Sequence, residues 1–265
     1  MLFRSLLPGA REVEFTFPAE KAADVAVAVD VSDPGRLGEG IAVFEKADRR
    51  LVVDHHRTNP YFGDENVVDG GAAAVCEILW RLFDRQYVDR AVAQCLYTGL
   101  VHDTGNFSHS NTSAQVLSIG AELISLGVNA SEIVEKTVST VTFVQNKILG
   151  RALERAQLAL SGALAWTLIT QEDIAETGAK TSDFEGIVDR LRNTEGTKAA
   201  MFLYESAPGR YKVSLRSGEE LDVSRIAVKF GGGGHLRAAG CEIEGGREVV
   251  MKDLIAEIEA GLRQN

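Results

Sequence analysis

The sequence has little of what marks a secreted, membrane-spanning or DNA-binding protein. Its 265 residues include only three cysteines, Cys76, Cys95 and Cys241, which lie far apart in apolar surroundings. Such cysteines are typical of buried free thiols in a reducing compartment, so we expect a cytoplasmic protein. Apolar runs are strand-sized or interrupted by charge, so we expect no membrane span. The opening residues 1–9 are too short and broken for a signal peptide.

Positive charge is also in short supply. The formal net charge is −10, which argues against a non-specific binder of duplex DNA, because such a protein needs a basic face. A small phosphorylated substrate needs only a local positive pocket and stays compatible with this charge. The apolar content of 45% and charged content of 25% are those of an ordinary globular protein, and the length suffices for two domains.

Histidine is scarce as well, yet two of the five histidines are adjacent. The apolar run 51–53 predicts a buried strand of a parallel sheet, and Asp54, His55 and His56 follow it directly. Open α/β sheets bind their ligands at the carboxyl ends of strands, and imidazole and carboxylate groups are good ligands for Mn or Zn. The alternative is a strand-end turn with solvated histidines.

Two further acidic residues follow apolar segments. Asp30 ends the apolar stretch 22–30, and Asp103 follows the apolar helix-to-loop segment around Val101. If these positions share one sheet edge with His55, their side chains converge on a metal ion. Each carboxylate taken alone is more often a turn or helix-cap residue.

The order of elements predicts an α/β fold with two domains. Strand and helix patterns alternate over 1–128, which favours a parallel sheet with helices on both faces. Residues 129–159 have helical periodicity without a strand signal, as a connection would. Residues 160–265 predict a smaller mixed-sheet α/β domain, in which 183–191 is a helix.

Four consecutive glycines, 231–234, precede His235 in this second half. Glycine backbone can turn its N–H groups toward an anion because no Cβ is in the way, so the run predicts a phosphate or carboxylate cradle. The alternative is a flexible linker. Arg216, at the end of the strand 211–215, is placed either to bind the same phosphate or as a solvated edge-strand residue.

Together these motifs resemble the DHH phosphoesterase superfamily, in its branch of bacterial nanoRNases (oligoribonuclease and pAp-phosphatase enzymes). The resemblance rests on VAVDVSDPGRLG around Asp30, VVDHHRTN around His55, GLVHDTGNFSHSNT around Asp103, and FGGGGHLRAAG with VSLRS in the second half. The last two match the DHH-associated C-terminal domain of that family. The blocks occur in the family's order and cover nearly the whole chain.

The resemblance implies a parallel-sheet catalytic domain that faces a substrate-binding domain across a cleft, and hydrolysis of a phosphoester with two Mn ions. By similarity, Asp30 would bridge the ions, and His55 and Asp103 would hold one of them. His56, in a catalytic pair with Asp54, would lie near the scissile phosphate. The substrate's terminal phosphate would be held by Arg216, Gly232, Gly233, Gly234 and His235. The implied substrates are short RNA, a dinucleotide or 3′-phosphoadenosine 5′-phosphate (pAp), and a homodimer is left open.

One family motif has no counterpart before Asp30: a His, three residues, then Asp-x-Asp, followed by Gly-Ser. Without it the second ion would keep only Asp30 as a protein ligand, and we expect these 265 residues to bind nucleotide but hydrolyse it slowly. A chain extended to include the motif is expected to turn over normally. The alternatives are therefore an active Mn-dependent phosphoesterase and a nucleotide-binding member that does not cut. An inorganic pyrophosphatase or polyphosphatase is a third, which the GGGGH-containing domain disfavours.

Overall fold

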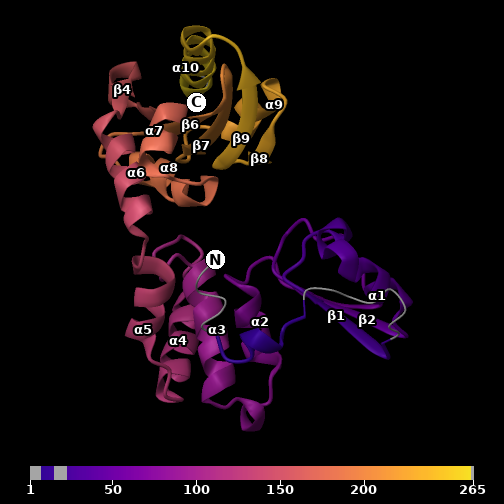
Figure 1. Ribbon diagram of the computed structural model, residues 1–265. Coiled ribbons are helices and arrows are strands. Elements are labelled where there is room, and N and C mark those ends of the chain that lie inside the picture. The colour runs from indigo at the N-terminus through magenta and orange to yellow at the C-terminus, as the bar shows by residue number, and fades with distance from the viewer. Residues whose placement is uncertain (1–6, 15–22, 264–265) are drawn as a thin grey trace. The chain divides into compact units, whose positions relative to one another are not determined.

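The protein consists of two compact units, Met1–Thr140 and Val141–Asn265. A computed structural model describes residues 7–14 and 23–263 (Figure 1). The division at residue 140 falls inside the segment 129–159 that was expected to connect two domains. The helices of that segment are therefore shared between the units rather than forming a separate connection.

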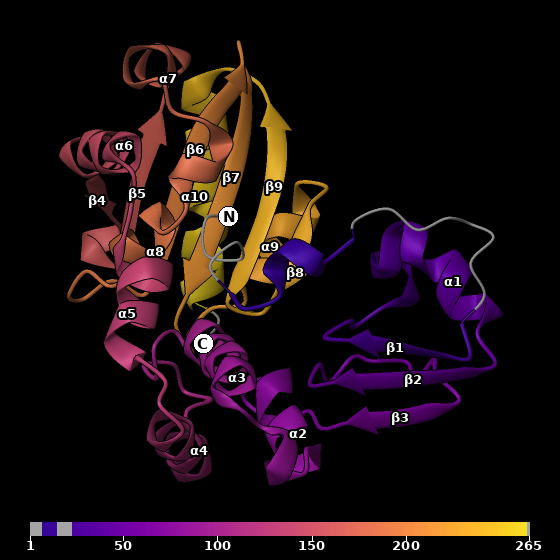
Figure 2. The same ribbon diagram turned by 60° about the horizontal axis from the view of Figure 1, so that its bottom comes forward.

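The first unit contains a parallel three-stranded sheet, as the sequence predicts. Its strands are β1 (Val25–Val29), β2 (Arg49–Asp54) and β3 (Glu65–Val68), in that spatial order (Figure 2). Val29 lies opposite Val53 in the parallel register. The carboxyl ends of β1 and β2 are therefore neighbours, which brings the residues after them together.

Helices cover both faces of this sheet at its centre. On one face Val52 packs with Phe44 of α1 (Ile41–Lys46), and on the other Val53 packs with Ile78 of α2 (Val75–Leu82). Val52 and Val53 are both buried although they point to opposite faces of the strand, because each face has its own helix. This agrees with the prediction of helices on both faces.

The outer strand β1 is less well covered. Val25, Val27 and Val29 are 49%, 52% and 40% exposed. Within the described residues no strand pairs with the outer edge of β1. Parallel sheets usually have both faces buried, so this strand is the least protected part of the sheet.

The remaining helices of the first unit form a layer around a second apolar core. Asp89 and Ser113 cap α3 (Arg90–Asp103) and α4 (Ala114–Ser125), each accepting a hydrogen bond from a backbone N–H three residues on. A short α5 (Ala130–Val134) and a π-helical turn follow. Among the described helices none alone has the length and apolarity to cross a membrane; α4 with the segment to Ser139 meets that test only as a pair bent by 114°.

The second unit contains a mixed six-stranded sheet, again as predicted. The spatial order is β4-β5-β6-β7-β9-β8, and only β5 and β6 run parallel. The strands are β4 (Gln157–Ala159), β5 (Leu164–Ile169), β6 (Ala199–Ala207), β7 (Arg210–Ser217), β8 (Gly233–His235) and β9 (Ala238–Glu244). β6 and β7 form a hairpin that turns through Ala-Pro-Gly.

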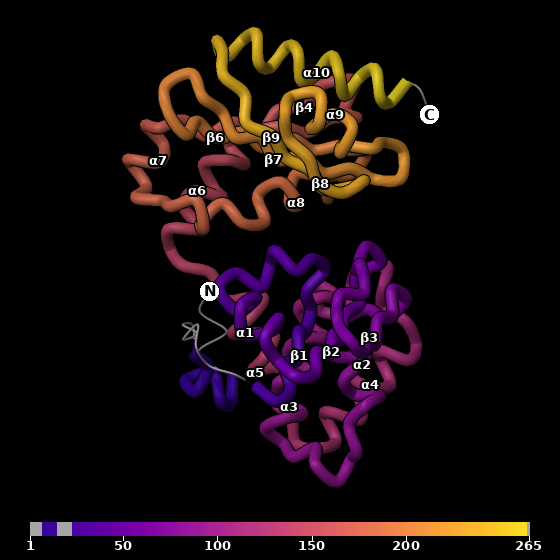
Figure 3. The backbone as a smooth tube through the Cα atoms, turned by 90° about the vertical axis from the view of Figure 1, so that its right-hand side faces the viewer, coloured from indigo at the N-terminus to yellow at the C-terminus, as the bar shows by residue number. Residues whose placement is uncertain are grey.

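Helices pack on both faces of this sheet (Figure 3). On one face lie α9 (Val223–Lys229) and α10 (Arg247–Arg263), and on the other α6 (Phe143–Glu154) and α8 (Ile187–Arg192). A further helix, α7 (Gln171–Thr177), follows β5.

Short helical segments of other kinds occur in both units. The 3₁₀ segments are Ala10–Glu12, Pro34–Gly40, Arg85–Tyr87, Leu160–Gly162 and Thr181–Phe184, and a π-helix occupies Glu135–Ser139.

Two sequence predictions for this unit are wrong in detail. The helix predicted over 183–191 is divided by Gly186, whose φ of +82° lies in the left-handed region and begins a new helix, α8. The segment 129–159 was expected to be wholly helical, yet its last three residues form the edge strand β4. A left-handed glycine in the first case, and pairing with β5 in the second, decides over local periodicity.

The glycine run is not a loop, because Gly233–His235 is the edge strand β8. A Cβ at Gly232 would lie 2.1 Å from the carbonyl oxygen of Gly240, and one at Gly234 would lie 2.6 Å from that of Ala238. A Cβ at Gly233 would meet no atom within 4 Å. The close approach of β8 to β9 therefore requires glycine at two of these positions and not at the third.

This contact predicts different effects for two chemically identical substitutions. Gly232→Ala should lower the free energy of unfolding by about 1–3 kcal/mol, because its methyl group must displace backbone of β9. Gly233→Ala should leave it unchanged or raise it by up to about 1 kcal/mol, because alanine fits the site and restricts the unfolded chain. Urea denaturation of both variants checks this, and equal effects would contradict the packing described here.

Candidate functional site

The site begins where β1 and β2 end side by side. Asp30 follows β1 with φ +59°, and its backbone N–H donates to the carbonyl oxygen of Val53 at 3.0 Å. A left-handed conformation is uncommon for a residue with a Cβ, but aspartate tolerates it better than most. At this turn the chain leaves the sheet, and the turn lies directly beside the Asp54-His55-His56 segment. The sequence prediction that these groups share one edge is confirmed for Asp30 and His55.

Asp54 is the buried centre of this segment. Its side chain is fully buried, and its Oδ1 accepts hydrogen bonds from the backbone N–H of His55 at 2.9 Å and from Nδ1 of His56 at 2.7 Å. Its Oδ2 accepts from Nδ2 of Asn59 at 2.6 Å. Burial opposes ionisation of Asp54, but the hydrogen bonds from His56 and Asn59 outweigh it and lower the pKa of the carboxyl. A catalytic role for Asp54 stays a prediction, and this geometry favours one exerted through His56.

His55 presents one ring nitrogen to the protein and the other to a group of acids. Its Nδ1 lies 3.3 Å from the carbonyl oxygen of Ala72, while its Nε2 lies 3.4 Å from Oδ1 of Asp30 and 3.9 Å from Oδ2 of Asp103. The hydrogen bond to Asp30 raises the pKa of His55 to about 8. The same hydrogen bond lowers the pKa of Asp30.

Asp103 reaches the site from a helix rather than from a strand end. It is the last residue of α3, and its carbonyl oxygen accepts a hydrogen bond from Nδ2 of Asn111 at 3.1 Å. The same Nδ2 lies 3.1 Å from the carbonyl oxygen of Ala73, next to the Ala72 carbonyl that contacts His55. Asn111 thus ties the end of α3 to the segment that orients His55. Sequence reasoning did not single out Asn111 or Asn59, although both lie within the quoted motifs.

The chain leaves Asp103 through a strained turn. Gly105, Asn106 and Phe107 have φ of +54°, +56° and +59°, three left-handed residues in succession. Left-handed backbone costs about 1–2 kcal/mol per non-glycine residue, so other contacts must stabilise the turn. The hydroxyl of Thr104 accepts from the backbone N–H of Phe107, and the Phe107 ring packs against Tyr97. This turn reverses the chain immediately beside the Asp103 carboxylate.

These side chains fit a divalent metal ion by chemistry and by placement. One ligand atom from each of Asp30, His55 and His56 lies within 4.8 Å of the others. Mixed imidazole and carboxylate donors suit Mn or Zn. A metal-binding histidine usually donates its other N–H to a carbonyl or carboxylate, and the contact of His55 with Ala72 provides that arrangement. The sequence predicted Asp30, His55 and Asp103 as ligands; in the structure the group consists of Asp30, His55 and His56, and Asp103 lies beside it, 3.9 Å from Nε2 of His55.

Arg216 and His235, predicted to hold a phosphate, lie at the same level of the second sheet. Arg216 on β7 and His235 on β8 both pair with Ala238 of β9, one on each side. Residues paired in this way share a face of the sheet, roughly 10 Å apart across two strand spacings. Nε of Arg216 donates to Oδ1 of Asp189 on α8 at 2.8 Å. Arg216 is therefore an ion-paired residue, not the solvated edge residue of the alternative interpretation.

The predicted glycine cradle needs correction. Its glycines belong to a strand and its approach, and the N–H of Gly232 donates to the carbonyl oxygen of Ala227 at 2.9 Å. Gly232 therefore has no N–H left for an anion. The flexible linker, the alternative interpretation, is wrong as well. Phosphate binding by Gly233, Gly234 and His235 stays a prediction.

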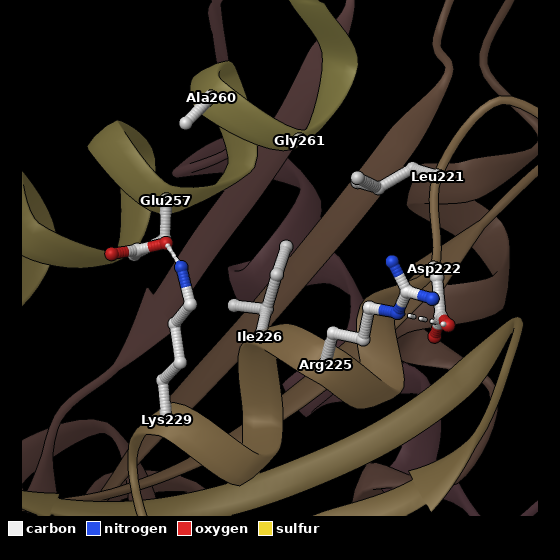
Figure 4. Close-up of a pocket in the computed structure, with 8 residues that line it drawn as sticks. All are labelled: Leu221, Asp222, Arg225, Ile226, Lys229, Glu257, Ala260 and Gly261. Atoms are coloured by element: carbon white, nitrogen blue, oxygen red, sulfur yellow. Dashed lines mark hydrogen bonds and ion pairs between the residues drawn. The ribbon is translucent and has the colours of Figure 1, made fainter. Parts of the chain in front are cut away.

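A pocket of about 290 Å³ between α9 and α10 does not coincide with the predicted residues (Figure 4). Two cations line it, and each faces a carboxylate: Arg225 lies 3.3 Å from Asp222, and Lys229 pairs with Glu257. The sticks in Figure 4 show both cations rising from one helix beside the apolar side chain of Ile226. Because these charges compensate each other, the pocket has no excess positive charge to attract a phosphate.

The pairing of His55 with Asp30 predicts how the metal-free protein titrates. The imidazole should titrate near pH 8, and Asp30→Asn should return its pKa toward about 6.5. Because the folded-state pKa is raised, the pair stabilises the protein fully below about pH 6.5, and this contribution is lost as pH rises through about 8. An NMR titration of the imidazole signals in both proteins checks this; an unchanged pKa in Asp30→Asn would contradict the pairing.

Comparison with known proteins places the chain in a family. Residues 161–264 match the family model described as the DHHA1 domain. The chain is 33% identical over 248 residues to the bifunctional oligoribonuclease and PAP phosphatase NrnA of Thermus thermophilus, covering 92% of this chain and 72% of that protein. It is 29% identical over 198 residues to NrnA of Bacillus subtilis, covering 73% of this chain and 62% of that one.

A solved structure agrees with these relatives. The crystal structure of an exopolyphosphatase-related protein from Bacteroides fragilis superposes with a TM-score of 0.81 at 27% identity, over 91% of this chain and 72% of that one. The chain thus spans about three fifths to three quarters of these proteins. From the identity to the Thermus protein, the DHHA1 match and the site around Asp54-His55-His56, the chain belongs to the DHH phosphoesterase superfamily, in the NrnA branch of bacterial nanoRNases.

Proposed function

We propose that this protein is a Mn-dependent phosphoesterase that hydrolyses short oligoribonucleotides or dinucleotides, pAp, or both. The observation that carries the proposal is the convergence of Asp30, His55 and His56 on one point at the end of the parallel sheet. The names of the NrnA relatives, oligoribonuclease and PAP phosphatase, support the choice of substrates.

In this proposal Asp30, His55 and Asp103 hold a divalent ion. Nε2 of His55 already faces both carboxylates, at 3.4 and 3.9 Å, and its contact with Ala72 keeps that nitrogen turned toward them. A bound Mn ion would stabilise charge on a phosphoryl oxygen and activate water at neutral pH. A second ion, if bound, would share Asp30.

His56 is proposed to act on the substrate itself. Its Nδ1 donates to the buried carboxylate of Asp54, which leaves Nε2 as the nitrogen free to contact a phosphate. The T-shaped contact of the two histidine rings, with centroids 4.8 Å apart, keeps His56 next to the ion-binding nitrogen of His55. Positioning of this kind, rather than covalent chemistry, is what phosphoryl transfer mainly requires.

The second unit is proposed to recognise the substrate's terminal phosphate. Arg216 and His235 flank Ala238 on one face of the sheet, and the ion pair with Asp189 holds the guanidinium of Arg216 in place. A guanidinium has five N–H donors, so Arg216 can bind a phosphate while it keeps the Asp189 contact. The net charge of −10 makes such a local cation important for attracting an anionic substrate.

A second candidate function is nucleotide binding without hydrolysis. It is favoured by the number of metal ligands. The described residues hold one group of three clustered ligating side chains, whereas hydrolysis in this family is expected to use two ions. A hydrolysis assay on a diribonucleotide and on pAp, with Mn and with a chelator, decides between the two. Mn-dependent release of mononucleotide or phosphate supports the enzyme; nucleotide binding without product supports the alternative.

The metal proposal predicts a selective loss in His55→Ala. Mn affinity should fall by more than tenfold, about 1.4 kcal/mol or more, because the substitution removes a ligand that faces both Asp30 and Asp103. His235→Ala is the matched control, since it removes an imidazole from the other unit. Calorimetry that finds the same Mn affinity in both variants would rule out this site.

The phosphate proposal predicts the opposite selectivity in Arg216→Ala. Nucleotide affinity should fall by roughly 1.5–3 kcal/mol, the size of a hydrogen bond to a charged group, while Mn affinity stays unchanged. Asp189→Asn is the control, because it weakens the ion pair but keeps the guanidinium. Asp189→Asn should lose less affinity than Arg216→Ala; if Arg216→Ala binds nucleotide as tightly as the parent, the phosphate site lies elsewhere.

A further inference from the structure

We propose that Asn59 is a positioning residue that locks the ends of β1 and β2 together and thereby fixes His56 relative to Asp30. The inference concerns the mechanism of the proposed phosphoesterase and rests on that function. Asn59 follows the two histidines by three residues and is 5% exposed. A buried side-chain amide must have its hydrogen bonds satisfied, so its partners reveal what it holds in place.

Both hydrogens of the Asn59 amide have partners in the site. Nδ2 donates to Oδ2 of Asp54 at 2.6 Å and to the carbonyl oxygen of Val31 at 3.0 Å. Val31 is the residue after Asp30, and Asp54 is the last residue of β2. One amide group therefore bridges the chain just beyond β1 and the carboxylate that orients His56.

The orientation of this amide is fixed from its other side. Oδ1 of Asn59 accepts from the backbone N–H of Tyr61 at 2.8 Å, and Tyr61 has a left-handed φ of +58°. Rotating the amide by half a turn would place its oxygen against the Asp54 carboxylate and the Val31 carbonyl, and its NH₂ against the Tyr61 N–H. The site accepts an amide in one orientation only.

The consequence for the chemistry follows from what Asp54 holds. Oδ1 of Asp54 binds Nδ1 of His56, and Nδ1 of His56 lies 3.8 Å from Oδ1 of Asp30. If Asn59 is lost, Oδ2 of Asp54 loses its partner and the carboxylate can rotate, so His56 is no longer held in one tautomer and direction. The link between the Asp30 turn and β2 loosens at the same time.

The experiment compares Asn59→Ala and Asn59→Asp with Asn66→Asp. Asn59→Asp keeps the shape but replaces the donor NH₂ with an oxygen that faces Asp54. Asn66 is a matched control in β3, because its amide also makes two hydrogen bonds, both to the backbone of Gly63, without touching the site. Two quantities are measured: kcat and KM for a diribonucleotide with Mn, and the ¹⁵N signals of the His56 ring in the metal-free proteins.

We expect both Asn59 variants to lose at least about tenfold in kcat, because misplacing a reacting group by about 1 Å can cost on the order of 10²-fold in rate. Their KM should change by less than about threefold, because the residues proposed to recognise the substrate lie elsewhere. In the parent the His56 ring should be protonated on Nδ1, and in the variants this signal should be replaced by exchange between tautomers. Asn66→Asp should resemble the parent in both measurements.

Unchanged ¹⁵N signals of His56 in both Asn59 variants would overturn the inference, as would an equal loss of kcat in Asn66→Asp, which would indicate general destabilisation. If the parent hydrolyses no substrate, the proposed function fails, and the His56 signals in the metal-free proteins still decide whether Asn59 positions that ring.

Discussion

The buried carboxylate of Asp54 is the group on which the rest of the site depends. Three donors meet it: the backbone N–H of His55, the ring of His56 and the amide of Asn59. A hydrogen bond to a buried charged group typically contributes about 1.5–3 kcal/mol, so each of these three donors matters. The carboxylate therefore holds the backbone of His55 and the ring of His56 at the end of β2. Their positions relative to Asp30 then follow from the parallel register of β1 and β2.

The two units contribute different kinds of rigidity. In the first, the site groups lie on turns, at Asp30 and after Asp103, where left-handed residues store strain and hydrogen bonds hold the backbone. In the second, Arg216 and His235 lie on paired strands, where register alone sets their separation. The proposed metal ligands must converge on a point, which turns permit, whereas the proposed phosphate-binding groups can lie along a sheet face.

Much of this could be predicted from the sequence, and the reasons are local. Apolar runs that end in Asp30 and Asp54 are strands, because a buried parallel strand needs continuous apolar residues and its polar neighbours mark its end. Helix starts at Asp89 and Ser113 follow from side chains that accept the free backbone N–H groups. The family resemblance, carried by the quoted motifs, agrees with the NrnA relatives.

What sequence reasoning missed depends on contacts between distant residues. The glycines at 231–234 have the composition of a loop, and only the approach of β9 makes Gly233–His235 a strand. Asn59 and Asn111 are ordinary turn residues by composition, and their roles follow from carbonyl groups 28 and 38 residues away. Periodicity and propensity contain no information about such partners.

The central claim is that Asp30, His55 and Asp103 form a metal site served by His56. Anomalous X-ray diffraction at the manganese edge, from crystals of the protein grown with Mn, tests it most directly. The account predicts an anomalous peak within bonding distance of Nε2 of His55 and of the carboxylates of Asp30 and Asp103. A fully ordered site without such a peak, or a Mn ion bound only to other residues, would contradict it.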